Sequence, residues 1–226
     1  MSNREPRLIL RVAVLTGAVL FTVLAVSACD INVFGERGSG NVITESRVVS
    51  DFNEIALSGS GEVVVDVNGA ESLTIEAEDN IMPLLKTEVH SGRLELGTES
   101  SISPTVTIVY TISAAVLDGV SVDGSGDITS TGIDASSFAV AISGSGQIEA
   151  AGTADMLTVD ISGSGSYDGE KLVASVGTVI VSGSGDAVVN VMDRLDAEVS
   201  GSGSVEYIGD PNLSSSVTGS GDISRR

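Results

Sequence analysis

A four-residue unit, Ser-Gly-Ser-Gly or a close variant with apolar neighbours, recurs along this 226-residue chain. The first glycine of each copy stands at positions 38, 59, 124, 144, 163, 183, 201 and 219. The steps between copies are 21, 65, 20, 19, 20, 18 and 18 residues, and the long step is close to three ordinary ones. A fixed period near 20 residues is typical of stacked repeats. We therefore expect regular turns, with degenerate turns between positions 59 and 124.

Within each copy the glycines and the flanking apolar residues share one parity, and the serines take the other. In one copy, Ile142, Gly144 and Gly146 alternate with Ser143 and Ser145. Because alternate side chains of a strand face opposite ways, this pattern predicts extended chain with glycines inward and serines outward. The simplest such fold is an all-β, single-domain β-solenoid with 18–21-residue rungs. Its rungs are spaced by about 4.8 Å, and we expect about eight to ten of them.

The first residues are typical of an export signal. Three arginines, at positions 4, 7 and 11, precede an apolar run from Val12 to Val26, which is too short for a comfortable transmembrane helix. Val26-Ser27-Ala28-Cys29 follows and resembles the lipobox of bacterial lipoproteins, so Cys29, the single cysteine, is the predicted lipidation site. The alternative is a free or buried cysteine after a plain secretory signal. The predicted organisation is a lipoprotein signal at 1–28, a lipidated N-terminus and tether at 29–40, and a solenoid domain at 41–226.

The charge of the exported part excludes some partners. Removing residues 1–28 takes away three arginines and one glutamate, which changes the net charge from −20 to about −22. Proteins that bind nucleic acid are basic, and anionic headgroups repel such a domain. We therefore expect no nucleic-acid partner, and contact with the membrane only through a lipid on Cys29. The expected location is the bacterial cell envelope, either periplasmic or surface-exposed.

The first half of the domain is less regular than the second. Residues 79–85 have a helical pattern that Pro83 limits to one turn, and 89–96 reads as a hairpin or a corner followed by a strand. From Leu117 onward the repeat is nearly regular, and the chain stops one strand past the last motif. The final rung is therefore expected to present an open edge. The Arg225-Arg226 pair would discourage stacking there, or the edge would pair with another chain, for example in a homo-oligomer.

Two outward columns are candidate binding features. Carboxylates follow the motif at Glu62, Asp127, Asp186 and Asp222. Rung spacing puts Asp127 and Asp186 about 14 Å apart, too far to share a calcium ion. We interpret them as a solvated acidic face. The serine ladder is the candidate ligand-facing surface for a polysaccharide, although a tight bend also favours small polar residues. Its members are Ser60, Ser125, Ser145, Ser164, Ser184, Ser202 and Ser220.

Catalytic chemistry has little support in the sequence. A nucleophilic serine needs an adjacent base and an orienting acid, and the single histidine, His90, lies in the irregular half. β-Helices that cleave carbohydrate usually have clustered carboxylates and basic residues in a groove. The few basic residues are scattered, and three lone tyrosines are more typical of rim or core positions. We predict no catalytic residue, no metal ligand and no cofactor.

Several short segments of the domain form an ordered set, which includes Phe52-Asn53-Glu54-Ile55, Leu57-Ser58-Gly59-Ser60-Gly61, Leu73-Thr74-Ile75-Glu76-Ala77, Gly92-Arg93-Leu94-Glu95-Leu96 and the later Gly-Ser-Gly turns. Together these segments resemble the head GIN domain family of putative auto-transporter adhesins. The similarity covers the chain from about Val42 to the C-terminus and is specific only as a set. It implies a right-handed parallel β-helix on an exported, often lipid-anchored protein, and it carries over no catalytic residue.

The sequence thus predicts a non-enzymatic, lipid-anchored protein that binds or adheres to a polysaccharide or an envelope protein. One alternative is a structural component of the envelope that self-associates through the solenoid edges. A second alternative is a glycan-active enzyme.

Overall fold

The computed structural model describes residues 35–226, within a compact unit that spans Asn32–Arg226 and contains its own hydrophobic core. The predicted signal at 1–28 and the predicted lipidation site Cys29 lie outside the described residues. Within residues 35–226, no helix is long and apolar enough to span a membrane. Because the unit has its own core, we expect it to fold without the segment that precedes it.

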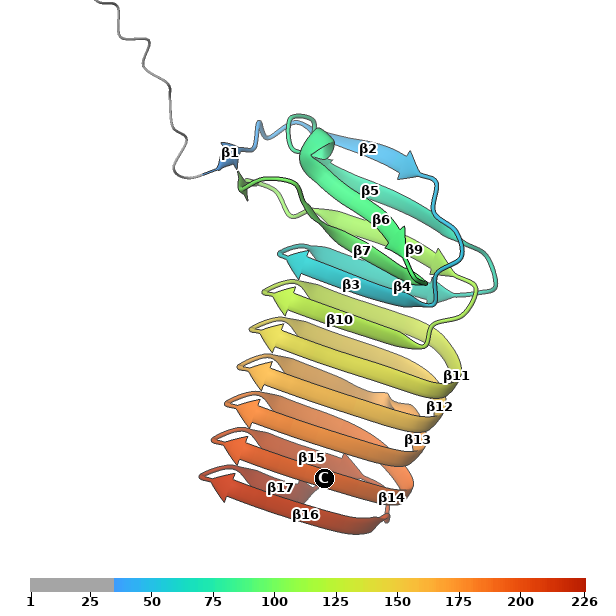
Figure 1. The fold of residues 1–226 in the computed structure, drawn as a ribbon, viewed down its shortest axis with the longest axis vertical. Coiled ribbons are helices and arrows are strands. Elements are labelled where there is room, and N and C mark those ends of the chain that lie inside the picture. The colour runs from blue at the N-terminus through green and yellow to red at the C-terminus, as the bar shows by residue number, and fades with distance from the viewer. Residues whose placement is uncertain (1–34) are drawn as a thin grey trace, which may run out of the picture. The chain divides into compact units, whose positions relative to one another are not determined.

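The regular part of the fold is a right-handed parallel β-solenoid of about five turns, which confirms the solenoid fold that the sequence predicted (Figure 1). Each strand pairs in parallel with the strand of the next rung. The strands of this part are β10 (Gly119–Gly124), β11 (Asp127–Gly144), β12 (Gln147–Gly163), β13 (Ser166–Gly183), β14 (Asp186–Gly201), β15 (Ser204–Ile208), β16 (Asn212–Gly219) and β17 (Asp222–Arg225).

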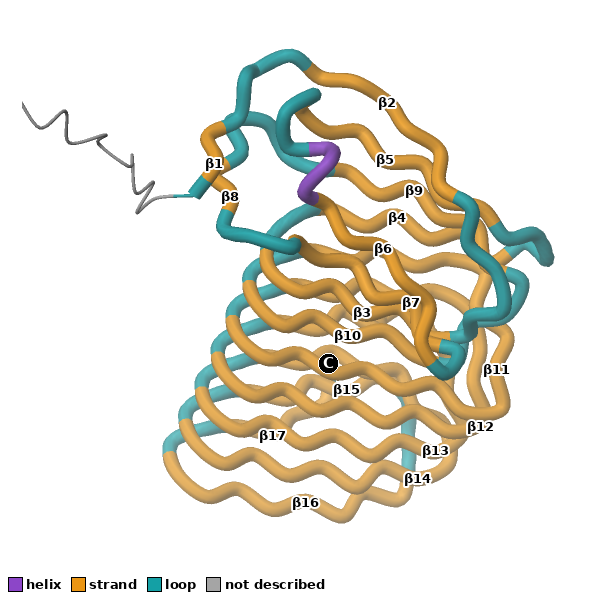
Figure 2. The backbone as a smooth tube through the Cα atoms, turned by 45° about the horizontal axis from the view of Figure 1, so that its top comes forward, coloured by secondary structure: helices purple, strands orange, loops and turns teal. Residues whose placement is uncertain are grey.

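The long strands belong to both faces of the solenoid. In β11, residues 127–131 pair with β4 (Glu62–Val67) on the back face, and residues 139–144 pair with β10 on the front face. The chain bends between them, where the register against β12 shifts from Ser130 to Ile133. Each rung is therefore two strand segments joined by a wide bend at one edge and by a Ser-Gly turn at the other (Figure 2).

The first half of the domain corrects one prediction. Residues 60–118 do not form three successive turns, because β3 (Glu54–Gly59) pairs directly with β10, and β4 pairs directly with β11. The intervening chain instead covers the N-terminal end of the winding, so the solenoid has fewer turns than the eight to ten expected. This chain comprises β5 (Ser72–Glu78), the 3₁₀ turn η1 (Met82–Leu84), β6 (Leu85–His90), β7 (Arg93–Thr98), β8 (Ile102–Ser103) and β9 (Val109–Ala114).

The covering strands are partly antiparallel. On the front face β7 is parallel to β3, and β6 pairs antiparallel with β7 through a turn at Ser91-Gly92. Of the two alternatives predicted for 89–96, a hairpin or a corner, the structure has the hairpin. On the back face β9 is parallel to β4, whereas β5 and then β2 (Val42–Arg47) add antiparallel strands. The one-turn helix predicted at 79–85 corresponds to η1. The winding is thus covered at its N-terminal end and ends openly at β16 and β17.

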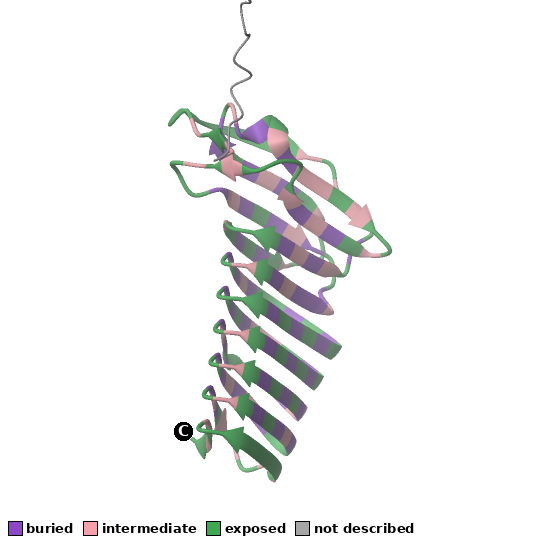
Figure 3. Cartoon of the chain, turned by 60° about the vertical axis from the view of Figure 1, so that its left-hand side comes forward, coloured by how far each residue is buried: buried purple, intermediate pink, exposed green. Residues whose placement is uncertain are grey.

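The core consists of stacked columns of aliphatic side chains between the two faces. One column, at most 2% exposed, passes through consecutive rungs as Val122, Ile142, Ile161, Val181 and Val199. Outward positions between them are exposed, so burial alternates along the long strands β11 to β14 (Figure 3). This alternation confirms the predicted parity. Burial of the inward apolar side chains stabilises the fold by about 25 cal/mol for each Å² of apolar surface removed from water.

The two glycines of each motif have different roles, which corrects the prediction that both face inward. Gly144 is exposed and has φ +118°, a backbone conformation that disfavours any side chain, and a Cβ there would overlap the carbonyl of Gly124. Gly146 is buried, and a Cβ there would stand 2.5 Å from the Val122 side chain. The first glycine therefore forms the turn, and only the second lies beneath the core column.

The described part of the predicted tether is held against the domain. β1 (Glu36–Arg37) pairs with β8, and the buried carboxylate of Glu78 accepts hydrogen bonds from the N–H groups of Gly40 (2.7 Å) and Thr105 (2.9 Å) and from the Thr105 hydroxyl. Asp79 accepts a hydrogen bond from the Ser39 hydroxyl (2.6 Å). These hydrogen bonds, above all the one from the Thr105 hydroxyl, hold the pKa of Glu78 below its ordinary value.

Candidate ligand-binding face

The predicted serine ladder is a continuous, exposed column at the Ser-Gly edge. All seven serines are exposed, and each except Ser60 donates its backbone N–H to the first glycine of the rung before it, for example Ser164 to Gly144 at 2.8 Å. These hydrogen bonds fix the backbone of every turn and leave the hydroxyls at the surface. The 65-residue step does not interrupt the ladder, because Ser125 donates to Gly59 (2.9 Å).

A second column runs beside the ladder on the front face. Strand register aligns residues that directly precede the first glycine of each motif, and they are exposed hydroxyls in every rung but one, where Asp123 stands. Its members are Ser58, Asp123, Ser143, Ser162, Ser182, Ser200 and Thr218. Sequence reasoning did not single out this column, although the serine before each motif glycine was a visible signal. We call the two columns together the hydroxyl edge.

The acidic column lies on the back-face side of the ladder. Asp127 is in register with Glu62 on the neighbouring strand, a proximity that their separation in sequence concealed. Asp186 accepts hydrogen bonds from the hydroxyl (2.6 Å) and the N–H (3.0 Å) of Ser204 in the next rung. Residues 35–226 contain no group of three or more His, Cys, Asp or Glu side chains placed to hold a metal ion.

A shallow depression of about 450 Å³ lies on the front face and adjoins the hydroxyl edge. Its floor has small residues on successive strands, Ala56, Ser121 and Ala141, and longer side chains stand around it. A volume of this size is in the range of small-molecule sites. The depression therefore offers room beside the serines Ser58, Ser143 and Ser162, which also line it.

Charged groups surround the depression. Arg93 donates two hydrogen bonds to Glu54, at 2.7 and 2.9 Å, so its charge is matched by a neighbour. Glu95, Asp123 and Asp160 add carboxylates that can accept hydrogen bonds from ligand hydroxyls. Such a surface suits a ligand that carries hydroxyls and little negative charge, because anions would be repelled.

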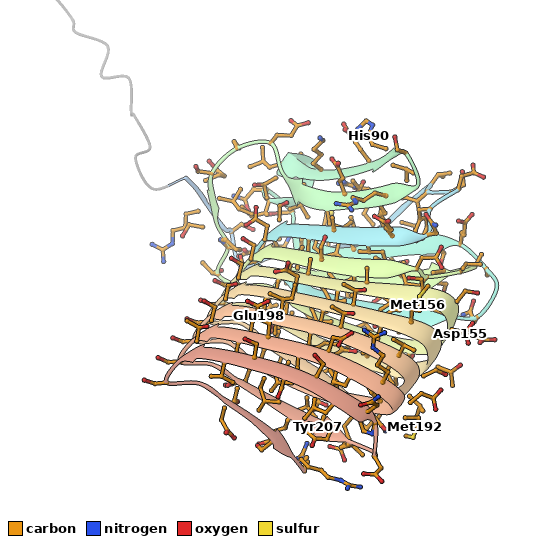
Figure 4. The ribbon with its side chains drawn as sticks, turned by 60° about the horizontal axis from the view of Figure 1, so that its bottom comes forward. His90, Asp155, Met156, Met192, Glu198 and Tyr207 are labelled. Carbon is orange, nitrogen blue, oxygen red and sulfur yellow. The ribbon has the colours of Figure 1, made fainter. Side chains whose placement is uncertain are left out.

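His90 lies apart from the hydroxyl edge. It is on the β6–β7 hairpin that covers the N-terminal end of the winding, and Figure 4 shows it at the end opposite Tyr207. Its ring nitrogen is 2.8 Å from Glu88, and both side chains are exposed.

The tyrosines are core or rim residues, as expected. Tyr110 and Tyr167 are 1% exposed, and Tyr207 is half-buried near the open end. Burial raises the pKa of Tyr110 to about 12 and also raises the pKa of Tyr167. Neither buried ring is available to stack on a sugar.

The few basic side chains of the domain are mostly paired with carboxylates. Besides Arg93, Lys86 contacts Glu88 (2.9 Å) and Arg47 contacts Glu45 (2.9 Å). Arg194 likewise contacts Asp196 (2.5 Å). The acidic balance of the sequence thus persists over the surface that surrounds these residues.

Comparison with known proteins places these features in a family. The family model described as "Putative auto-transporter adhesin, head GIN domain" matches residues 51–211. A crystal structure of a putative adhesin from Bacteroides fragilis NCTC 9343 has 26% identity and a TM-score of 0.66, and the match covers 85% of this chain and all of that one. Among curated proteins, none matches the sequence significantly.

Two structures from Parabacteroides distasonis ATCC 8503 share the fold at lower identity. A putative adhesin has 18% identity and a TM-score of 0.58, with 85% of this chain and 100% of that one covered. A protein described as a putative lipid binding protein has 24% identity and a TM-score of 0.53, with 84% and 98% covered.

Proposed function

Because this chain belongs to the family of putative auto-transporter adhesins with a head GIN domain, we propose that it is a non-enzymatic adhesion protein whose hydroxyl edge binds a polysaccharide. The family supports a role in adhesion and a location at the envelope or outside the cell. The polysaccharide, the edge that binds it and the absence of catalysis are our inferences.

The observation that carries the proposal is the pair of exposed hydroxyl columns. Successive rungs repeat the same hydroxyls about every 4.8 Å along a rigid backbone. A polysaccharide also repeats its hydroxyls along its length, so one chain can make equivalent hydrogen bonds at several rungs. Each of these hydrogen bonds is weak alone. Once one sugar unit is bound, however, its neighbours are held at a high effective concentration near the next rungs, so the total affinity rises.

The surrounding charge narrows the ligand class. The domain is strongly acidic, and Asp123, Asp160 and Glu95 stand at the depression beside the hydroxyl edge. A neutral or cationic polysaccharide fits this surface, whereas a polyanionic one would be repelled. The carboxylates would accept hydrogen bonds from sugar hydroxyls. Such hydrogen bonds to an ionised group are stronger than hydrogen bonds between two neutral groups.

We further propose that the protein is exported and anchored by a lipid on Cys29. The support is the sequence around that residue: a basic start, an apolar run, and Val26-Ser27-Ala28-Cys29. Incorporation of a labelled fatty acid in the native host tests this part. Wild type should be labelled and should fractionate with membranes, and Cys29→Ala should lose both properties. A wild-type protein that takes up no label would contradict the anchor.

A glycan-binding screen of the soluble domain from Asp30 onward tests the ligand. The binding variant carries Ser145→Val, Ser164→Val and Ser184→Val, which remove exposed hydroxyls from consecutive rungs. The control carries Ser136→Val and Thr153→Val, exposed residues at the opposite bend. We expect saturable binding of a neutral or cationic polysaccharide that the ladder variant loses and the bend variant keeps. Binding that survives the ladder substitutions, or turnover of the polysaccharide, would contradict the proposal.

A role in envelope assembly is the second candidate function. It is favoured by the open last rung of the solenoid, where Val217 is 45% exposed. In that role the protein would self-associate through its edges, and it would bind no polysaccharide in the same screen.

A further inference from the structure

The C-terminal end of the solenoid exposes positions that are core in every other rung of the winding. Val217 is in register with Val199, and Val217 is 45% exposed whereas Val199 is fully buried. Leu213 and Ile223 occupy the same kind of position and are only partly buried. The last rung therefore has an uncovered apolar interior between two strands, β16 and β17, that have a neighbour on one side only.

The end strand β16 lacks the charges that usually protect an edge. It reads NLSSSVTG over eight residues and carries no ionisable side chain. In the preceding rung the corresponding outward positions are Asp196 and Glu198, which are replaced here by Ser214 and Ser216. Natural edge strands carry charges, prolines or bulges that block pairing. At β16 the one such device is Pro211, just before the strand, whereas the other end strand, β17, carries Asp222 and Arg225.

The N-terminal end contrasts with this arrangement. Its edge strands β2 and β6 read VITESR and LKTEVH, with charged residues in both. Lys86 and Glu88 on β6 pair with each other at 2.9 Å. A second copy that approached with this end would have to bury those charges, and taking charges out of water is unfavourable even when they are paired.

We propose that the C-terminal end is the contact surface of a two-fold dimer whose other half is a second copy of this chain. A two-fold axis perpendicular to the solenoid axis sets two identical ends face to face, with their edge strands antiparallel. The exposed backbone groups of β16 can then pair across the contact, as in strand addition. Such an isologous contact is closed, so it gives dimers and not filaments.

The distribution of charge favours contact between two copies at the C-terminal end of the solenoid. Two copies of a domain with a net charge near −22 repel each other, so they can meet only where the local charge is small. The end rung meets this condition, because Arg225 pairs with Asp210 (3.1 Å) and Arg226 with Glu170 (3.1 Å). The arginines that the sequence suggested as a guard against stacking thus also neutralise acidic neighbours at the end.

Sedimentation velocity of the soluble domain, over a range of concentrations, tests the proposal. Wild type should show a reversible monomer–dimer equilibrium that strengthens as salt screens the repulsion. Ser216→Glu adds an outward charge at the end strand beside Glu198 and should weaken the dimer at least about tenfold. Thr178→Glu is the matched control, because it adds the same charge beside Asp196 in the middle of the same face and should leave the dimer unchanged.

A second variant and a second measurement separate loss of the contact from loss of the fold. Val217→Glu should abolish the dimer while circular dichroism stays that of the wild type. Hydrogen exchange should show protection of β16 that rises with protein concentration. A wild-type domain that stays monomeric to millimolar concentration, a dimer unaffected by Ser216→Glu, or an open-ended polymer would each overturn the proposal. None of these outcomes depends on whether a polysaccharide binds.

Discussion

Gly59 is in register with Gly124 on the adjacent strand, although 65 residues separate them. The contact joins the irregular first half of the domain to the regular winding and keeps the hydroxyl edge unbroken across the long step. β7 pairs with β3 separately, and that pairing brings Arg93 and Glu95 to the depression on the front face. The candidate ligand-binding face therefore depends on a pairing between distant parts of the chain.

Substitution of a first motif glycine should destabilise the fold strongly. In Gly144→Ala the alanine would have to keep φ at +118°, and its Cβ would overlap the Gly124 carbonyl. We therefore expect a loss of at least ~2 kcal/mol in the free energy of unfolding. Urea denaturation measures it. Gly59→Ala is the control: its φ is +101° but no atom lies within 4 Å, so about 1 kcal/mol is expected. Equal losses would show that steric overlap does not matter.

Truncation of an inward aromatic residue should create a cavity. Phe138 is fully buried, and Phe138→Ala is expected to cost about 3–5 kcal/mol by thermal or urea unfolding. Met156, in the same strand pair but 54% exposed, is the matched position, and Met156→Ala should change stability by less than ~0.5 kcal/mol. Similar effects of the two changes would contradict the assignment of inward and outward faces.

Arg47 should matter more than its surface location suggests. It donates hydrogen bonds from β2 to the carbonyls of Leu85 (2.6 Å) and Met82 (2.9 Å), and its side chain is only 19% exposed. Arg47→Ala removes both of these hydrogen bonds, which come from a charged donor, and should cost about 1–3 kcal/mol of unfolding free energy. Arg194→Ala removes a 62% exposed arginine and should cost less than ~1 kcal/mol. Comparable losses would argue that Arg47 contributes only surface charge.

Acid should loosen the N-terminal clamp that Glu78 forms with Gly40 and Thr105. The pKa of Glu78 is lowered in the folded protein, so its contribution is complete above the ordinary value of 4.5 and is lost as pH falls through the folded pKa. Hydrogen exchange of residues 35–41 should therefore accelerate, relative to the core strands, as the solution is acidified below that value. In Glu78→Gln the clamp should be weak at neutral pH and insensitive to acid. Unchanged pH dependence in this variant would assign the effect to another group.

The regular part of the fold could be predicted because local pattern and tertiary position agree there. Ile142 and Ile161 occur at the same parity in successive repeats, and the structure stacks them in one core column. At 89–96 the sequence predicted a hairpin or a corner because Ser91-Gly92 separates two strand-like runs, and the structure has the hairpin. The role of the first motif glycine could not be predicted, because parity along the chain does not reveal a turn with positive φ, as at Gly144.

The stacking order of the first half could not be predicted. The period suggests that consecutive repeats are neighbours, but nothing local in β4 indicates that its partners are β9 and β11. The depression in the candidate site could not be predicted either. The serine ladder was found from its repeat, whereas the depression needs Ala56 and Ser121 to lie side by side, and that follows only from the pairing of β3 with β10.

The pairing of β3 with β10 also sets the order in which the domain is expected to fold. A turn of the winding closes a loop of about 20 residues, whereas the Gly59–Gly124 contact closes one of 65, at an extra entropic cost of about 1 kcal/mol. The turns from β11 to β14 can therefore nucleate first, and the N-terminal strands dock on an edge that already exists. Pulse-labelled hydrogen exchange should find β12 and β13 protected before β3, and the reverse order would identify the N-terminal strands as the template.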